Sequence, residues 1–434
     1  MTKRVPTQKQ NLKRFGRSDE GQALVLTALA LVVLMLMAGL GVDVGYLRYQ
    51  KQQMQKAADA GAIAGASALL YGGSWKTAGQ YDASANGFTN GNNGTVVQVD
   101  TPWEGPFAGK AGYVEASVSQ PQPTFFMRVG GFTSVPVRSW AVASANTAGA
   151  GCIYVLDQSA KSSYTATGGA IVTANCAIYV DSANQSPGAF DQNGSGCTKA
   201  SSIGIVGTVW HDSCSVPATP STGMPYQADP LAGVAAPTVG AIPGTCTPQS
   251  GKITGGTVTL TPATFCGGIS ISGTNTNVTF SPGTYILYGG GLIVTSSTAI
   301  LSTGLPAGGS NGVTFYNTGT KNGTYGFSPI SINGGTITLT APTSGPLAGM
   351  LFFEDRDPTK TGQITNTITG GSGSTFTGAL YFPTTTLKYA GGTAFGGYTV
   401  VVADQVQFVG NSNFSNDYSS LTGGPLIHGV ALAE

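Results

Sequence analysis

The feature that most constrains this chain is an uncharged apolar run near its N-terminus, Gln22–Val42. Acidic residues stand on both sides of it, Glu20 before and Asp43 after. A helix of this length rises ~30 Å, the thickness of a bilayer's hydrocarbon core. Only a helix satisfies its own backbone in lipid without neighbouring strands. We therefore predict a transmembrane helix over 22–42, preceded by a basic cytoplasmic tail over 1–21.

The charges that flank this run predict its orientation. Six basic residues precede it and three follow closely: Lys3, Arg4, Lys9, Lys13, Arg14 and Arg17, then Arg48, Lys51 and Lys56. This excess favours a single-pass protein of the inner (cytoplasmic) membrane, with its C-terminal bulk periplasmic or extracellular. The net charge of +1 and the lack of a second basic patch argue against nucleic acid as a partner.

A cleaved secretory signal is the alternative interpretation of the same run. The small residues Gly39-Leu40-Gly41 resemble a cleavage site, but the apolar stretch exceeds the ~7–15 residues of a signal's apolar core. In either case the bulk of the chain leaves the cytoplasm.

The composition fits an extracytoplasmic β-protein. Only 9% of the residues are charged, against ~25% in ordinary soluble domains, and 65 glycines are present. The six cysteines all lie beyond the apolar run: Cys152, Cys176, Cys197, Cys214, Cys246 and Cys266. An even number in an oxidising compartment predicts disulfides; six cysteines allow fifteen pairings, of which we favour the sequential one. With no CxxC and only His211 and His428 as imidazoles, we expect no zinc site.

After the apolar run, good helix formers continue over 43–71, and Gly72-Gly73 ends the helix. Gly61 and Gly65 permit close packing against the domain that follows. In 72–146, period-two alternation at 95–99, 113–118 and 135–142 predicts strands of a small α+β domain. The stretch between the last two strands predicts a short packed helix ending at Gly130-Gly131.

The region from Glu20 to Ala66 resembles the N-terminal module of TadE/TadG-like proteins of the tight-adherence (Flp) pilus-assembly system. The resemblance depends on Glu20-Gly21-Gln22, the apolar run, Val42–Gly45 and Gln55–Ala60. It implies a single-pass anchor, pilus or secretion-system components as partners, and an assembly helix that includes Asp43, Gly45, Ala57, Ala58 and Asp59. Related prepilins carry a Glu five residues after a cleaved Gly; because this chain has Leu26 there after Gly21, we expect the span to stay attached.

Residues 147–434 show glycines that open short β-branched runs. Gly268, Gly291, Gly312 and Gly335 are spaced by 23, 21 and 23, and Gly371 and Gly392 by 21. A period near 22 predicts a right-handed parallel β-helix-like solenoid, so the expected fold class is mainly β after the N-terminal helix. A sandwich or barrel, with turns every 8–12 residues, is the alternative. The Pro-rich stretch 217–248 predicts a loop laid over the surface.

The spacing of 24 between Cys152 and Cys176 is one coil, and Cys246 and Cys266, 20 apart, fit neighbouring coils likewise. Phrases such as CIYVLD (152–157) and GALYFP (378–383) also resemble the C-terminal region of some TadG-like surface proteins.

Two clusters are candidates for chemistry. Asp157-Gln158-Ser159 is similar to the metal site of von Willebrand A domains, but Lys161 stands where that site needs a second hydroxyl. Glu354, Asp355, Arg356 and Asp357 form the densest charge cluster, which a carbohydrate-active β-helix enzyme would use as acid and base. Because Pro358 follows, we interpret this cluster as a solvated turn.

The sequence therefore predicts a structural or adhesive envelope protein, with no catalytic residue, cofactor or metal. Glycans or surfaces are possible partners of the solenoid. The alternative function is a membrane-anchored carbohydrate-binding or carbohydrate-active β-helix enzyme.

Overall fold

The computed structural model describes residues 20–433 apart from 71, 213, 217–218, 241–250, 305–311, 363, 372 and 391–396. The tail over 1–19, Cys246 and parts of the Pro-rich stretch lie outside the described residues. The chain divides into two compact units, one of Met1–Ala143 with Leu432–Glu434, the other of Ser144–Ala431. We describe each unit by itself.

Unit 1 begins with the long uninterrupted helix α1, Glu20–Leu70, of 51 residues. Its N-terminal half exposes large apolar side chains along its length, among them Leu24, Leu31 and Met37. This is a helix long and apolar enough to cross a membrane. Its C-terminal half buries one face, so the prediction of a long apolar helix that continues into a folded domain is confirmed.

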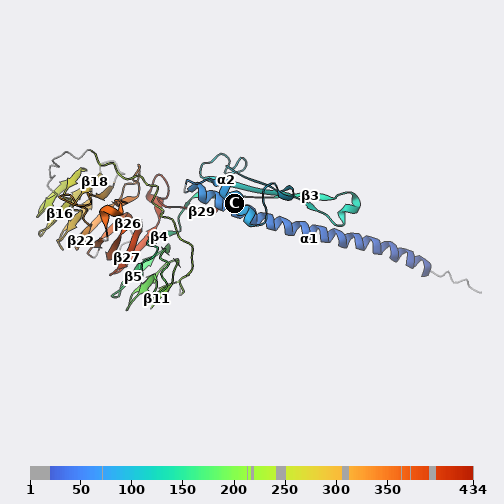
Figure 1. Cartoon of the computed structure of the whole chain (residues 1–434), viewed down its shortest axis with the longest axis horizontal. Coiled ribbons are helices and arrows are strands. Elements are labelled where there is room, and N and C mark those ends of the chain that lie inside the picture. The colour runs from blue at the N-terminus through green and yellow to red at the C-terminus, as the bar shows by residue number, and fades with distance from the viewer. Residues whose placement is uncertain are drawn as a thin grey trace, which may run out of the picture. The chain divides into compact units, whose positions relative to one another are not determined.

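The rest of unit 1 is a short helix and a sheet (Figure 1). The helix α2 spans Trp75–Ala85, and the sheet has the order β1-β2-β3-β29, with 3-10 turns η1 and η2 between strands. The bounds are β1 Val96–Asp100, β2 Tyr113–Pro123, β3 Ser134–Ala148, β29 His428–Leu432, η1 Asn92–Gly94 and η2 Met127–Gly130. Alternate residues of β1 are buried, as period two predicts. The predicted packed helix before Gly130-Gly131 is wrong: the chain makes only η2, which is exposed.

Unit 2 contains strands β4–β28, the short helix α3 and the turn η3, so the C-terminal region is β-rich as expected. The first part comprises β4 Gly151–Val155, β5 Tyr164–Ala166, β6 Ile171–Ala174, β7 Ala177–Val180, β8 Phe190–Gln192, β9 Cys197–Lys199, β10 Ser202–Ile205, β11 Val209–Asp212 and β12 Ser215–Val216.

The second part comprises β13 Lys252–Ile253, β14 Gly256–Leu260, β15 Thr264–Cys266, β16 Ile269–Ile271, β17 Thr276–Phe280, β18 Gly283–Tyr288, β19 Leu292–Val294, β20 Ile300–Thr303, β21 Val313–Thr318, β22 Ser331–Asn333, β23 Thr336–Thr340, β24 Met350–Glu354, α3 Pro358–Thr361, β25 Thr365–Thr369, β26 Thr375–Ala390, β27 Tyr398–Phe408, β28 Ser412–Asn416 and η3 Tyr418–Ser420.

Most strands of unit 2 pair in parallel with the third strand further along the chain. One such column is β13–β16–β19–β22–β25, a second is β14–β17–β20–β23–β26, and a third is β15–β18–β21–β24. Three strands therefore make one layer, and each layer lies on the one before it. Apolar side chains face inward, and neighbouring layers place aromatic rings in contact, as for Phe280, Phe315 and Phe352.

The layers are not stacked in sequence order. The first layer, β4–β6, lies between β7–β9 on one side and β27–β28 on the other. The chain runs outward from β4 to β12, crosses over, restarts at the opposite end with β13 and returns to β4 (Figure 1). Residues 219–240, which we call the crossover segment, include the described part of the Pro-rich stretch; its Leu231 is fully buried in the core of the unit.

The predicted period near 22 residues is wrong, because the spacing between paired positions of neighbouring layers varies. Tyr389 pairs with Phe408, 19 positions further on, whereas Val294 pairs with Ile332, 38 positions further on. The layers keep a similar set of paired strands, but the loops between these strands vary in length. The spacing of 23 between Gly268 and Gly291 matches one layer, because Ile269 pairs with Leu292, but the repeat changes in later layers.

Candidate functional site

The first candidate site is the point where the apolar part of α1 meets the loop between β2 and β3. Asp43 is fully buried, and its carboxylate accepts hydrogen bonds from the backbone N–H groups of Phe125, Phe126 and Met127 at 2.8, 2.9 and 2.6 Å. Burial acts to raise the pKa of Asp43, but the three N–H donors lower it below its ordinary value. The side chain therefore stays ionised and holds the loop against the helix.

Two aromatic contacts add to this attachment. The ring of Phe126 lies on Gly39, where a Cβ atom would come within 2.5 Å of it. Tyr46 contacts Phe125 edge to face with ring centroids 5.3 Å apart, and its hydroxyl donates to Gln122. Gly39 therefore provides the close approach that Phe126 needs.

The small residues of α1 pack against the rest of unit 1, as the Gly61 and Gly65 spacing predicts. A Cβ at Gly61 would lie 3.0 Å from the carbonyl oxygen of Gly79, and one at Gly65 would lie 2.8 Å from Val114. Ala57 and Ala58 are fully buried on the same side. These residues hold the helix to its own domain.

The remaining residues of the predicted assembly helix lie differently. Gly45 is exposed with open space around it, and Asp59 accepts a hydrogen bond from Gln55 at 2.8 Å. Val44 and Ile63 are 41% and 42% exposed. Apart from Asp43 and Met54, the buried residues of α1 are small, whereas these two branched side chains face outward.

The cysteines form disulfides where the structure describes them. Cys152 pairs with Cys176, and Cys197 with Cys214. Cys266 is also disulfide-bonded, but its predicted partner Cys246 lies outside the described residues. Cys152 and Cys176 join two adjacent layers, because β4 and β7 are paired strands.

The second candidate site is the charge cluster at the end of β24, and it is not a solvated turn at its first two positions. Glu354 is fully buried; its carboxylate accepts hydrogen bonds from Asn366 at 2.8 Å and Thr385 at 2.6 Å. Burial raises the pKa of Glu354 to about 8, although both hydrogen bonds act to lower it. With no exposed surface, this carboxyl group has no access to a substrate.

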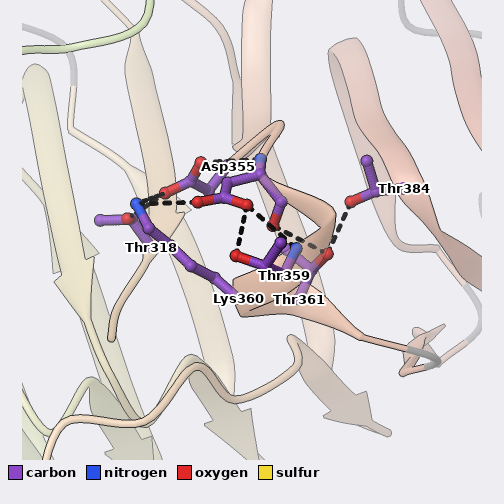
Figure 2. Close-up of polar contacts among 7 residues, drawn as sticks. Thr318, Asp355, Thr359, Lys360, Thr361 and Thr384 are labelled. Atoms are coloured by element: carbon purple, nitrogen blue, oxygen red, sulfur yellow. Dashed lines mark hydrogen bonds and ion pairs between the residues drawn. The ribbon is translucent and has the colours of Figure 1, made fainter. Parts of the chain in front are cut away.

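Asp355 is 8% exposed and belongs to a network of polar side chains (Figure 2). It accepts hydrogen bonds from Thr318 at 2.6 Å and from the Lys360 ammonium at 3.0 Å. The bond to Asp355 raises the pKa of Lys360. Asp357 accepts from the backbone N–H and hydroxyl of Thr359 and so caps α3.

Arg356 connects the layers to the crossover segment. Its Nη2 donates to the carbonyl oxygens of Leu231 and Val234 at 2.8 and 2.9 Å, and its Nε donates to the Tyr381 hydroxyl at 2.7 Å. The Tyr381 hydroxyl in turn donates to Asp229 at 2.7 Å. Each of the four residues 354–357 thus forms hydrogen bonds within the chain.

A groove of about 590 Å³ lies beside this cluster, lined by residues that include Tyr288, Tyr316, Lys321 and Asp355. It is the closest feature to a binding surface near the polar cluster. The carboxylates at its edge already accept hydrogen bonds from their neighbours, Asp355 from Thr318 and Lys360 and Asp357 from Thr359.

The Asp157 cluster does not form a metal site in the described residues. One carboxylate oxygen of Asp157 accepts from the N–H groups of Ser159 and Ala160, and the other accepts from Gln405 at 3.0 Å. Across the part of the chain that the structure describes, no group of three or more His, Cys, Asp or Glu side chains is arranged to hold a metal ion.

The partners of these charges could not be found from local sequence. The N–H donors to Asp43 are 82 to 84 positions away, and Asn366 and Thr385 lie 12 and 31 positions from Glu354. One signal was available: Gly39 belongs to a group of small residues, Ala38, Gly39 and Gly41, near the end of the apolar run, and small residues permit a close contact on a helix.

Comparison with known proteins agrees with the geometry of α1. No curated protein and no solved structure matches the chain. Residues 21–68 match the family model described as putative Flp pilus-assembly TadE/G-like, which covers the apolar run, Asp43 and the small-residue face. Over residues 21–68 the N-terminal module of this chain is therefore similar to the TadE/G-like Flp pilus-assembly family.

Proposed function

We propose that this protein is a membrane-anchored structural component of Flp-type pilus assembly at the cell envelope. The main support for the proposal is that the two halves of α1 have different surroundings. Its first half exposes apolar side chains over a bilayer's thickness, and its second half packs against α2 and the sheet of unit 1; the family match covers both halves of the helix. The helix thus joins an anchor rigidly to an assembly domain.

The anchor crosses the cytoplasmic membrane once, with the basic tail in the cytoplasm and, outside it, unit 2 and the part of unit 1 that follows the span. The excess of basic residues before the span supports this orientation. Two disulfides in unit 2 also support an oxidising compartment. We propose that the span stays attached, because the glutamate expected by a prepilin peptidase is absent after Gly21.

Pilus components are the proposed partners of the exposed side of α1 beyond the span. This side carries Val44, Gly45, Tyr49 and Ile63, of which Tyr49 is 55% exposed. The other predicted assembly residues make their contacts within unit 1 and hold the helix to it: Ala57, Ala58 and Asp43. The proposed contact surface is therefore the face of α1 opposite to its buried small residues.

We propose that unit 2 is a parallel β-helix that presents a surface for adhesion and has no catalytic role. Parallel pairing of each strand with the third one further on supports the β-helix. The structural role is supported by the polar cluster, in which Glu354 is buried and Arg356 is bonded to backbone carbonyls. Hydroxyl-rich outer positions suit glycans or surfaces as ligands.

The test is genetic and topological. Deletion of the gene is expected to reduce surface pili and adhesion, and the full chain restores both, whereas a chain with Tyr49→Glu on the exposed helix face does not. Tyr81→Glu, at a site 72% exposed on α2, is the matched control and is expected to complement fully. Unchanged pili and adhesion in the deletion strain would contradict the proposal. Alkaline phosphatase fused to the C-terminus reports the side of the membrane, since it is active only outside the cytoplasm.

A further inference from the structure

The loop between β2 and β3, residues 124–133, exposes an unusual set of apolar side chains. Phe125 is 55% exposed, Phe126 48%, Phe132 62% and Val129 84%. Arg128 is the only charged residue of the loop. A contiguous exposed patch of this kind marks an interaction site.

The position of the loop along α1 is fixed. Phe126 lies on Gly39, which is inside the uncharged run, and Asp43, the first residue after the run, binds three N–H groups of the loop. Gly39 precedes the end of the run by three residues, so the loop reaches ~4–5 Å along the axis into the apolar part of the helix. A bilayer that covers the run also meets the loop.

Several backbone N–H groups of the loop have hydrogen-bond partners within the protein. Asp43 satisfies the N–H groups of Phe125, Phe126 and Met127. Turn bonds satisfy others: Val129 donates to Phe126, Gly131 to Arg128 and Phe132 to Met127. Lipid offers no partner for an unpaired N–H group, so a loop that enters it must provide partners from the protein.

We propose that this loop is a second membrane contact, which inserts Phe126, Val129 and Phe132 among the lipid chains beside α1. The proposal rests on the membrane anchoring of α1. Arg128 reaches the lipid phosphates from the loop, as a long basic side chain does at an interface. Two attachments fix the tilt and rotation of α1 about its axis, which one helix alone leaves free.

The test is the depth of a nitroxide label in the full-length protein, reconstituted in phosphatidylcholine–phosphatidylglycerol vesicles. Labels are placed at Val129→Cys, Leu31→Cys and Val96→Cys under non-reducing conditions, which leave the disulfides intact. Electron paramagnetic resonance measures their collision with oxygen, which partitions into lipid, and with a nickel chelate, which stays in water. Leu31 reports the anchor, and Val96, 46% exposed on β1, reports water.

At Val129 we expect greater relaxation by oxygen than by the nickel chelate, as at Leu31 and opposite to Val96. A label at Val129 that behaves like Val96, while Leu31 lies in lipid, overturns the loop proposal and leaves the anchor intact. A Val129 label shielded from both reagents indicates a protein partner and also overturns it. If Leu31 is in water, the anchor itself fails. In Asp43→Ala, which removes the acceptor, the Val129 label is expected to lose its lipid signal while Leu31 keeps it.

Discussion

Replacement of Glu354 by Gln is the sharpest test of the buried cluster. Glu354 is fully buried and its pKa is raised to about 8, whereas the unfolded chain leaves it near the ordinary value of 4.5. The folded state therefore holds a proton that the unfolded state has released. The stability from this difference is fully present below pH 4.5 and is lost as the pH rises through 8.

The size of the effect follows from the shift. Each pKa unit corresponds to about 1.4 kcal/mol, so a shift from 4.5 to about 8 is on the order of 5 kcal/mol. Between pH 6.5 and 9 the part still to be lost is about 2 kcal/mol. For unit 2, residues 144–431, such a loss lowers the unfolding temperature by roughly 3 °C.

The assay is thermal unfolding of the full-length protein in detergent, at pH values from 6.5 to 9. We expect the wild-type protein to lose stability over this range relative to Glu354→Gln, which carries no charge at any pH. The difference between the two proteins removes the contribution of all other groups. Asp404→Asn is the control, because the pKa of Asp404 is raised only to about 6, so about three-quarters of its titration is complete at pH 6.5. Parallel curves for wild type and Glu354→Gln would refute the reasoning.

Three further predictions concern the other contacts. Replacing Cys152 and Cys176 together by Ser is expected to cost unit 2 about 3 kcal/mol, measured by denaturant unfolding, because a bridge between paired layers is lost; an unchanged midpoint would contradict this. Gly65→Ala is expected to cost ~1–3 kcal/mol because its Cβ meets Val114, whereas Gly45→Ala on the open side of the same helix gains up to ~1 kcal/mol; equal melting temperatures would contradict the packing. Arg356→Met is expected to raise amide hydrogen exchange in the crossover segment about tenfold or more, since two charge-assisted bonds to its carbonyls disappear, and unchanged exchange would show that this segment is held by other contacts.

The sequence predicted features that depend on local patterns. The uncharged run over 22–42 predicted the exposed half of α1, and the 24-residue spacing predicted the Cys152–Cys176 bridge. Alternation predicted the buried and exposed faces of β1. In each case residues close in sequence determine the outcome, because helix and strand periods are local properties.

The sequence could not predict which layers are neighbours. Alternation says which side of a strand is buried, but not that β27 lies against β4, some 250 residues apart in the chain. For the same reason the sequence predicts Glu354 to be solvated, whereas the structure buries it. Its partner Asn366 comes from another strand and becomes adjacent only when the layers stack. Glycine spacing failed because loops of different length separate similar strands.

The position of β4–β6 inside the stack has a consequence for how this protein is made. Because a polypeptide is made from its N-terminus, the first layer, β4–β6, is synthesised long before β27–β28, which pairs with one side of it. Until β27–β28 is made, the backbone donors and acceptors on that side of the first layer are unpaired. An unpaired strand edge can form hydrogen bonds with other chains. Completion of the first layer therefore depends on residues 398–416, and a truncation before them would leave the beginning of the unit unpaired as well as shorten its end.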